Sequence, residues 1–351
     1  MTIAPLDPAD AAAIDEWYDL VVAVTRHDLP DFPTPSRRAH VARFTHPWPH
    51  STEEAILARD GAHIIGAASY QIPQNEDLST LYLDLIVHPA HRRRGVGTNL
   101  LQAVEAAARR HHRTLIEVET VRALAGGPAR DESGYRYLTA RGHRPGMTSI
   151  RSRCELPVRG PLLCSPIGAA ADHPSLCSPV RAAAAGYSLI QWRDAAPAEL
   201  IDDLAALQTR LMLDAPTGTL SADQRSYDAA RLRAQEATEQ ARGHRSYSTA
   251  ARHDSTGRIV ARTKLAFESA ANTHARQRIT LVEPAHRGHR LGMQIKSANH
   301  AYAQAHEPPL RFIDAWNADD NTHMRAVNTQ LGFRPVDAWP AFQLSCGAQG
   351  T

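Results

Sequence analysis

The segment Arg92-Arg-Arg-Gly-Val-Gly97 has side chains and spacing that suit the binding of an anion. It follows an apolar run that ends at Val87, and a helical pattern begins near Gly97. Glycines let backbone N–H groups approach an anion, a helix N-terminus adds about half a positive charge, and arginines add donors. The segment therefore predicts a pyrophosphate cradle, with a solvated basic turn as the alternative. It is neither a Walker loop, since no Gly-Lys-Ser/Thr follows, nor a Gly-x-Gly-x-x-Gly dinucleotide turn.

The segment recurs later in the chain. Val87–Gly97 and Val282–Gly292 are identical at six of eleven positions, at an offset of 195 residues. The same offset aligns the apolar pairs Ile64-Ile65 and Ile259-Val260. These repeats indicate a tandem duplication.

Hydrophobic periodicity predicts the same order of elements in both halves. In the first half we expect a helix over 8–24, strands at 63–71 and 79–87, a helix over 98–112, a strand at 115–120, a helix ending at 141 and a strand at 148–156. In the second half we expect a helix over 198–213, strands at 246–251, 259–267 and 277–282, a helix over 291–305, a strand at 310–315 and a helix over 321–331. The proline-rich segment 157–185 between them is predicted to be a linker.

Composition limits the remaining possibilities. A chain of 351 residues with 43% apolar content is too long for one core, so two domains are expected. The net charge of +2 gives no global field that would select nucleic acid or an anionic membrane. No long apolar segment and no signal-peptide pattern is present, which predicts a soluble cytoplasmic protein. The four cysteines have no CxxC spacing and the histidines have no metal-binding spacing, so we expect free thiols and no metal. Amine-nucleophile chemistry has two candidate lysines, Lys264 and Lys296.

These motifs resemble those of the GCN5-related N-acetyltransferase (GNAT) superfamily. Arg92-x-x-Gly95-x-Gly97 matches the family's acyl-CoA motif, Arg/Gln-x-x-Gly-x-Gly/Ala, in full. In the second half Arg287 and Gly292 match, Arg290 replaces a glycine, and Asn321 to Phe333 is similar to the family's Asn-to-Leu-Gly-Phe helix. Two such domains in one chain resemble mycothiol synthase and related tandem acetyltransferases of actinobacteria.

The resemblance implies two GNAT-like α/β (α+β) domains, residues 1–156 and 186–351, joined by the linker 157–185. Each would have a mixed, mostly antiparallel sheet with helices on both faces, and its fourth and fifth strands would splay apart. Acetyl-CoA would be the cosubstrate. Its pantetheine arm would follow Leu85, Ile86 and Val87, and its pyrophosphate would meet Arg92, Arg93, Arg94, Gly95, Val96, Gly97 and Thr98. The corresponding residues of the second half are Val282, Arg287, Gly288, Gly292, Asn321 and Asn328.

The resemblance also implies a base on a strand and a tyrosine acid. Asp84 is the first candidate base, with Glu117 and Glu119 in reserve, although each could instead be a paired surface carboxylate. In the second half Ile279 takes the place of Asp84. The candidates there are Glu283, His286 and Asp314, and the loop 214–218 could cover an acceptor.

The family's tyrosine position holds Leu138 in the first half and Asn328 in the second. A tyrosine acid would therefore have to come from Tyr135 or Tyr137, for each of which a packed aromatic ring is the alternative.

We therefore expect an N-acetyltransferase that transfers acetyl from acetyl-CoA to the primary amine of a small molecule by direct attack. The alternatives are a protein or peptide amine acetyltransferase, and a non-catalytic acyl-CoA-binding or aminoacyl-tRNA-using relative of the same fold. The acceptor, the catalytic half and the oligomeric state stay open.

Overall fold

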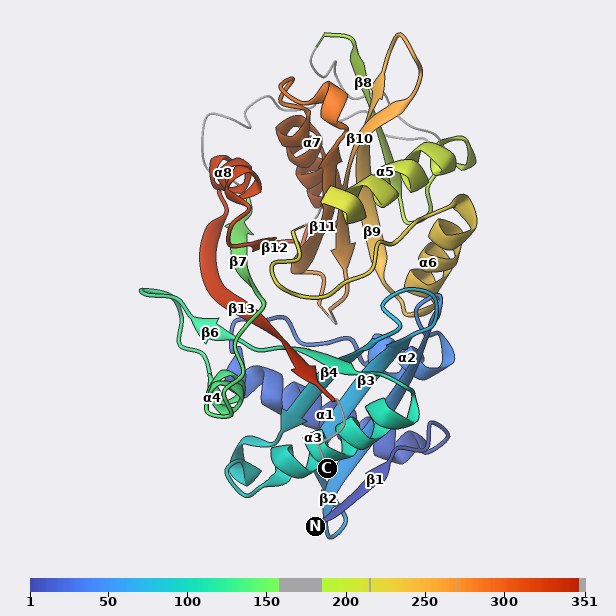
Figure 1. Ribbon diagram of the computed structural model, residues 1–351. Coiled ribbons are helices and arrows are strands. Elements are labelled where there is room, and N and C mark those ends of the chain that lie inside the picture. Colours follow the sequence, from blue (N-terminus) through green and yellow to red (C-terminus); the bar gives the residue numbers. More distant parts are fainter. Residues whose placement is uncertain (158–184, 215, 270, 347–351) are drawn as a thin grey trace. The chain divides into compact units, whose positions relative to one another are not determined.

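The computed structural model describes residues 1–157, 185–214, 216–269 and 271–346, which divide into two units (Figure 1). Unit 1 comprises Met1–Ile150, Pro216–Gln224 and Val336–Thr351, and unit 2 comprises Arg151–Ala215 and Arg225–Pro335. Unit 1 thus contains segments from both halves of the sequence.

The sheet of unit 1 is mixed and mostly antiparallel. Its parallel pair is β4–β5. A helix connects these two strands, because parallel neighbours need a crossover connection. The strands are, in order across the sheet, β1 (Thr2–Pro5), β2 (Ser51–Asp60), β3 (His63–Pro73), β4 (Thr80–Val87), β5 (Leu115–Glu119) and β13 (Arg334–Ser345), with the short β6 (Arg122–Ala123) paired to β13.

Helices cover both faces of this sheet (Figure 1). Alternate residues of a strand point to opposite faces, so β2 sends Ile56 to the core under α3 (Val96–Arg110) and Leu57 to the core under α1 (Ala11–Asp28). Trp17 of α1 is the largest fully buried side chain there, and α2 (Arg37–Thr45) packs His40 against it. The last helix of unit 1 is α4 (Ser133–Thr139).

Unit 2 repeats this arrangement, with β11–β12 as its parallel pair. The strands run β8 (Tyr187–Arg193), β9 (Arg245–His253), β10 (Ile259–Phe267), β11 (His274–Val282), β12 (Phe312–Ala318) and β7 (Met147–Glu155). The helices are α5 (Ile201–Asp214), α6 (Ala229–Ala241), α7 (Leu291–His306) and α8 (Thr322–Gln330). The predicted fold class and its duplication are confirmed.

The predicted halves 1–156 and 186–351 differ from the observed units at three places. Residues Arg151–Glu155 of β7 belong to unit 2, whereas Val336–Ser345 of β13 and the segment Pro216–Gln224 belong to unit 1. Pairing of β13 with β5 accounts for the second exchange. The predicted linker 157–185 lies almost wholly outside the described residues.

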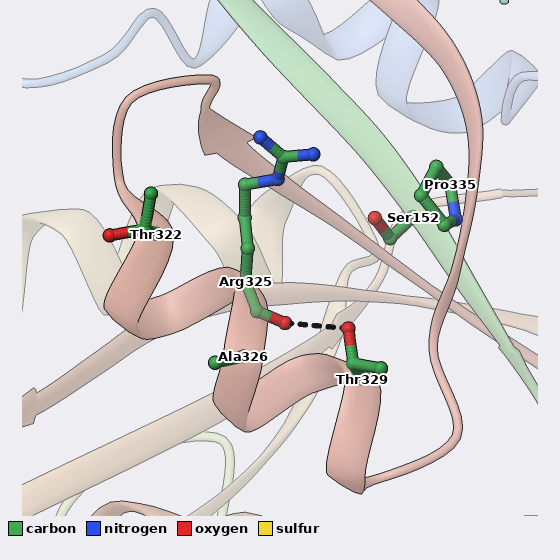
Figure 2. Close-up of a pocket in the computed structure, with 6 residues that line it drawn as sticks. All are labelled: Ser152, Thr322, Arg325, Ala326, Thr329 and Pro335. Carbon is green, nitrogen blue, oxygen red and sulfur yellow. Dashed lines mark hydrogen bonds between the residues drawn. The ribbon is translucent and has the colours of Figure 1, made fainter.

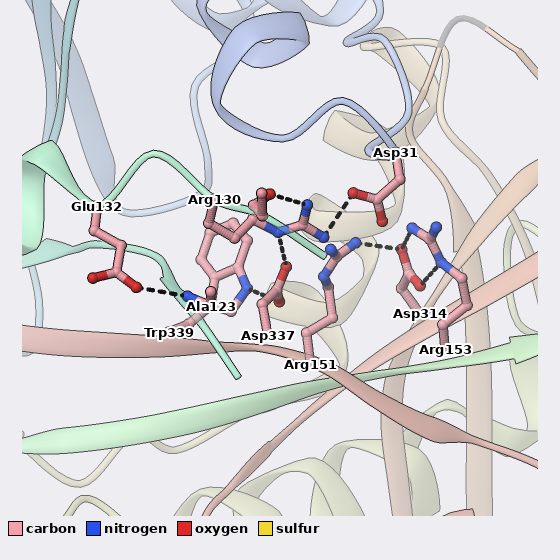
Figure 3. A network of polar contacts seen from close by, with 10 residues as sticks. Asp31, Ala123, Arg130, Glu132, Arg151, Arg153, Asp314, Asp337 and Trp339 are labelled. Atoms are coloured by element: carbon pink, nitrogen blue, oxygen red, sulfur yellow. Dashed lines mark hydrogen bonds and ion pairs between the residues drawn. The ribbon is translucent and has the colours of Figure 1, made fainter. Parts of the chain in front are cut away.

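Buried ion pairs hold the exchanged strands within their units (Figure 3). In unit 1, the fully buried Arg130 donates to Asp337 of β13 over 2.7 Å, and Trp339 Nε1 donates to the same carboxylate. In unit 2, Asp314 of β12 accepts from Arg151 at 3.2 Å and from Arg153 at 2.6 Å, both on β7. Each buried charge is thus matched by an opposite one.

Three further observations bear on the sequence analysis. Cys154 and Cys346 are buried free thiols, whereas Cys164 and Cys177 lie outside the described residues. None of the helices in the described ranges is both long and apolar enough to cross a membrane. The segments 51–60, 37–45 and 229–241, for which no element was predicted, form β2, α2 and α6.

Candidate functional site

The loop between β4 and α3 forms a concave array of backbone N–H groups. Arg93 and Gly95 have left-handed backbones, with φ of +61° and +83°, and they alternate with right-handed or extended neighbours. Such alternation turns successive N–H groups toward one point and makes an anion-binding nest. Gly95 is also the N-cap of α3, so the positive end of a 15-residue helix adds to the nest.

Arg92 anchors this loop. Its Nε donates to the carbonyl of Val87 over 3.0 Å, and its two terminal nitrogens pair with Asp28 and Asp131 at 2.8 Å each. The guanidinium that the sequence assigns to a phosphate is therefore already engaged by two carboxylates. His27, Asp28 and Asp131 also form a group with possible metal-ligand geometry, but Arg92 bridges its two carboxylates.

Exposed arginines surround the nest instead. Arg93 and Arg94 are exposed, and Arg141 of the turn after α4 donates to Thr98 in the first turn of α3 over 3.2 Å. Arg141 stacks on the ring of Tyr137, whose hydroxyl bonds the same threonine over 3.3 Å. Tyr137 thus lies at the anion-binding helix end, which leaves its predicted role as an acid without geometric support. Tyr135 packs against Phe342 in the core.

The strands β4 and β5 separate beyond the middle of β4. Their parallel pairing runs from Thr80–Leu115 to Leu83–Val118 and ends there, while the other edge of β4 continues with β3 as far as Val87. The predicted splay is therefore present. The edge of Asp84 to Val87 that faces away from β3 is where an extended ligand could pair its own polar groups with the strand. It includes the predicted pantetheine residues Leu85, Ile86 and Val87.

Three predicted carboxylates of unit 1 share one face of the sheet. Tyr82 and Glu117 are cross-strand partners, and Asp84 and Glu119 each lie two residues further along. The opposite face carries Leu81, Leu83, Ile116 and Val118, which pack under α3. Asp84, Glu117 and Glu119 therefore lie on the face away from α3.

Asp84 has the setting of a candidate base. Its side chain is reached by solvent, yet desolvation within the surrounding protein raises its pKa, and Arg43 opposes that rise. Arg43 donates to Ser69 Oγ over 3.3 Å, and Ser69 is the cross-strand partner of Asp84. The pKa of this carboxyl is thus raised by desolvation and lowered by one nearby cation.

Unit 2 builds its loop with glycine and arginine in the opposite order. Gly288 and Arg290 are the left-handed residues, with φ of +87° and +57°. Arg287 donates to the carbonyl of Val282 over 3.2 Å and pairs with Asp214 at 3.0 Å. Asp28 and Asp214 each end the first long helix of their unit, so the anchoring of the loop is also duplicated.

The unit 2 candidates for a base have different surroundings from Asp84. Asp314 is buried between two arginines, and Glu283 lies in the turn after β11, where its backbone N–H bonds the carbonyl of Val260. The ring of His286 bonds the hydroxyl of Tyr187 over 2.9 Å. Ile279 is buried at the place of Asp84.

The predicted asparagines of unit 2 have internal partners. Asn321 caps α8 by accepting from the N–H of Met324 over 3.2 Å. Asn328 accepts from Lys296 and donates to Asn317 over 2.6 Å. The sequence did not predict this buried network, although Lys296 was conspicuous as one of two lysines.

A separate small cavity of about 220 Å³ lies in unit 2 beside α8 (Figure 2). It contains no residue predicted for the site. Its lining is Ser152, Thr322, Arg325, Ala326, Thr329 and Pro335.

Comparisons with known proteins agree with this geometry. The Acetyltransferase (GNAT) family matches residues 21–125. A tandem GNAT protein from the clavulanic acid biosynthesis pathway is 29% identical, with a TM-score of 0.81 over 99% of both chains. A GCN5-related N-acetyltransferase from Sphaerobacter thermophilus is 16% identical, with a TM-score of 0.63 over 99% of this chain and 96% of that one, which shows the shared fold. No curated protein matches. Residues 21–125 are thus a GNAT acetyltransferase domain, and the chain as a whole has the tandem GNAT architecture.

Proposed function

We propose that unit 1 transfers the acetyl group of acetyl-CoA to the primary amine of a small molecule. The observation that carries this choice is Asp84, a carboxyl at the point where β4 leaves β5, with its pKa raised by desolvation. The place that corresponds to it in unit 2 holds Ile279. A general base must lie within reach of the proton that it takes, and it works best when its pKa lies near the working pH.

The residues of unit 1 fit an acyl-CoA donor. The nest at Arg93 and Gly95 and the N-terminus of α3 would hold the pyrophosphate, with Arg94 and Arg141 nearby. A Cβ built on Gly97 would lie 3.7 Å from Val87, so the first turn of α3 packs closely on the end of β4. The open edge of Leu85 to Val87 would pair with the pantetheine amides. Bound acetyl-CoA would supply an activated thioester.

Asp84 would take a proton from the acceptor ammonium, directly or through a water that it holds, so that the neutral amine attacks the thioester carbonyl. Collapse of the tetrahedral intermediate would break the C–S bond and release the CoA thiolate, which takes up a proton from solvent. Backbone N–H groups on the open edge of β4 would donate to the thioester oxygen as negative charge develops there. Attack would be direct, because the stretch from Thr80 to Arg110 contains no cysteine that could carry an acyl group.

Two features support a small acceptor. The similar tandem protein belongs to the biosynthesis of clavulanic acid, which is a small molecule. The net charge of +2 gives the chain no global positive field that would favour the binding of tRNA.

The test compares Asp84→Asn with Glu283→Gln in one acetyl-transfer assay. The assay screens small amines and peptides with acetyl-CoA by mass spectrometry. Loss of a general base typically costs about 10² to 10⁴ in rate, so Asp84→Asn should lose about that factor while CoA binding by calorimetry is retained. Full activity in Asp84→Asn together with collapse in Glu283→Gln would place the reaction in unit 2. Acetylation of peptides alone would replace the small acceptor with a protein amine.

A further inference from the structure

The connection between α5 and α6 enters unit 1. Its residues Pro216–Gln224, here called the strap, belong to unit 1, although the helices on either side belong to unit 2. The sequence predicted that the neighbouring loop 214–218 could cover an acceptor in the second half. Of that loop, residues 216–218 belong to unit 1.

Close packing fixes the beginning of the strap. Thr219 donates its backbone N–H to the carbonyl of Gly146 over 2.9 Å, and its hydroxyl bonds the same oxygen over 3.2 Å. A Cβ placed on Gly218 would lie only 2.3 Å from that carbonyl oxygen. Gly218 also has a φ of +61°, so both space and backbone favour glycine here.

The middle of the strap binds β13 beside the strand that carries Glu117 and Glu119. The backbone N–H of Ser221 donates to Gln343 Oε1 over 2.9 Å, and the backbone carbonyl of Ser221 accepts from Gln343 Nε2 over 2.8 Å. The same Nε2 donates to Glu117 Oε2 over 3.1 Å, and Gln343 is the cross-strand partner of Glu117. The strap therefore lies on the face of the sheet that carries Asp84 and Glu119.

The end of the strap reaches the start of β4. Asp223 and Asp77 exchange two hydrogen bonds of 2.6 Å, each backbone N–H donating to the other carboxylate. Asp77 Oδ2 then accepts from the hydroxyl of Tyr82 over 2.9 Å. Tyr82 is two residues before Asp84 on the same face, which corresponds to about 6.6 Å along the strand.

We infer that the strap is the acceptor-side wall of the unit 1 site and restricts its acceptor to a small hydrophilic amine. This inference rests on the proposed catalytic role of Asp84. The strap bonds Gln343 of β13 and Asp77 before β4 directly, and through them it is linked to Glu117 and Tyr82, which lie one step along the strands from Glu119 and Asp84. An amine that approaches Asp84 from this face meets the strap first, and a polypeptide would need its removal. Asp223 and Ser221 are positioning residues, because they act through Asp77, Tyr82 and Gln343.

The test displaces the strap and compares it with a matched glycine. Gly218→Val should drive the strap away from Gly146. Gly61→Val is the control, because Gly61 has a φ of +59° in the same unit and its Cβ would meet nothing within 4 Å. Both variants carry the same backbone strain, and only the first one clashes. Asp223→Ala is a milder variant in case Gly218→Val fails to fold.

Steady-state kinetics should separate the strap from the donor site. We expect Gly218→Val and Asp223→Ala to raise the acceptor KM about tenfold or more, with the KM for acetyl-CoA and the Kd for CoA unchanged. The ratio of kcat/KM for a bulky amine to that for a small amine should rise in both variants and stay constant in Gly61→Val. Hydrogen exchange at residues 219–223 should increase in the same two variants.

Failure of this inference and failure of the proposed function would give different results. Unchanged acceptor KM and selectivity in both strap variants, with exchange showing that the strap has moved, would overturn the inference while leaving Asp84 as the base. Full activity of Asp84→Asn would overturn the proposed function, and with it the placement of an acceptor beside the strap.

Discussion

Replacing Lys296 with methionine should change how the stability of unit 2 depends on pH. Lys296 is 1% exposed, and its ammonium has Asn328 as its hydrogen-bond partner. Burial lowers its pKa from 10.5 to about 7, while the Cys154 thiol opposes the shift slightly. Methionine is unbranched and apolar and can occupy much of the same space without a charge.

The magnitude follows from the linkage between protonation and folding. The pKa of Lys296 is lower in the folded state than in the unfolded state, so between pH 7 and 10.5 the unfolded chain binds more protons and stability rises with pH. Each pH unit inside this window contributes about 1.4 kcal/mol. The wild type should therefore gain about 2.5 kcal/mol of unfolding free energy between pH 6.5 and 9.0 that Lys296→Met does not gain.

The assay is urea denaturation of both proteins at pH 6.5, 7.5 and 9.0. The unfolding free energy of the wild type relative to that of the variant should be highest at pH 9.0 and lowest at pH 6.5. The double variant Lys296→Met with Asn328→Leu removes both partners of the hydrogen bond and so separates its loss from the charge effect. Parallel pH curves for wild type and Lys296→Met would refute the reasoning, because they would mean that Lys296 keeps an ordinary pKa when buried.

Three further outcomes are expected. Desolvation by the surrounding protein raises the pKa of Asp84, so the ascending limb of the pH profile of kcat/KM should lie above the usual carboxyl value, and Asp84→Asn should abolish that limb. Gly95→Val should raise the Kd for CoA measured by calorimetry, because φ is +83° at the nest, whereas Gly126→Val, at a φ of +74° away from the nest, should leave it unchanged. Arg92→Gln should lower the free energy of unfolding by about 2 to 3 kcal/mol, since Arg92 bridges Asp28 and Asp131; a loss of CoA affinity without any loss of stability would contradict this role.

The sequence alone determined the duplication and the position of the glycine-containing loop between β4 and α3. Both follow from local chemistry. Arg92-x-x-Gly95-x-Gly97 lies between a strand pattern and a helix pattern, and its backbone takes the predicted turn because Gly95 tolerates a positive φ. The apolar run of β3, the alternation in β4 and the apolar stripe of α3 were likewise sufficient to predict those elements.

Weakly patterned segments needed their tertiary neighbours. The helix α2 has the sequence Arg37-Arg-Ala-His-Val-Ala-Arg-Phe-Thr45 and no clear apolar stripe, but Trp17 packs against His40 and Phe44 on one of its sides. The strand β2 begins with Ser51-Thr-Glu-Glu54, and its pairing with β1 and β3 determines its extent. Packing and strand pairing override weak local propensity in both cases.

The roles of individual site residues also depended on the fold. From the sequence, Arg92 was an anion ligand and Asp314 a possible base, because both types suit those tasks. Only the folded chain brings Asp28 and Asp131 to Arg92, and Arg151 and Arg153 to Asp314. These partners lie at least 39 residues away in the chain, and no spacing rule predicts them.

Unit membership was the last feature that only the tertiary structure decided. Duplication predicts two units that follow the sequence halves, yet β13 pairs with β5 and the strap binds Gly146, Gln343 and Asp77. A strand edge can pair with any segment of suitable register, and backbone hydrogen bonds carry little sequence information. The sequence therefore shows which residues can act on an acyl donor, and the long-range pairing decides which segments surround them.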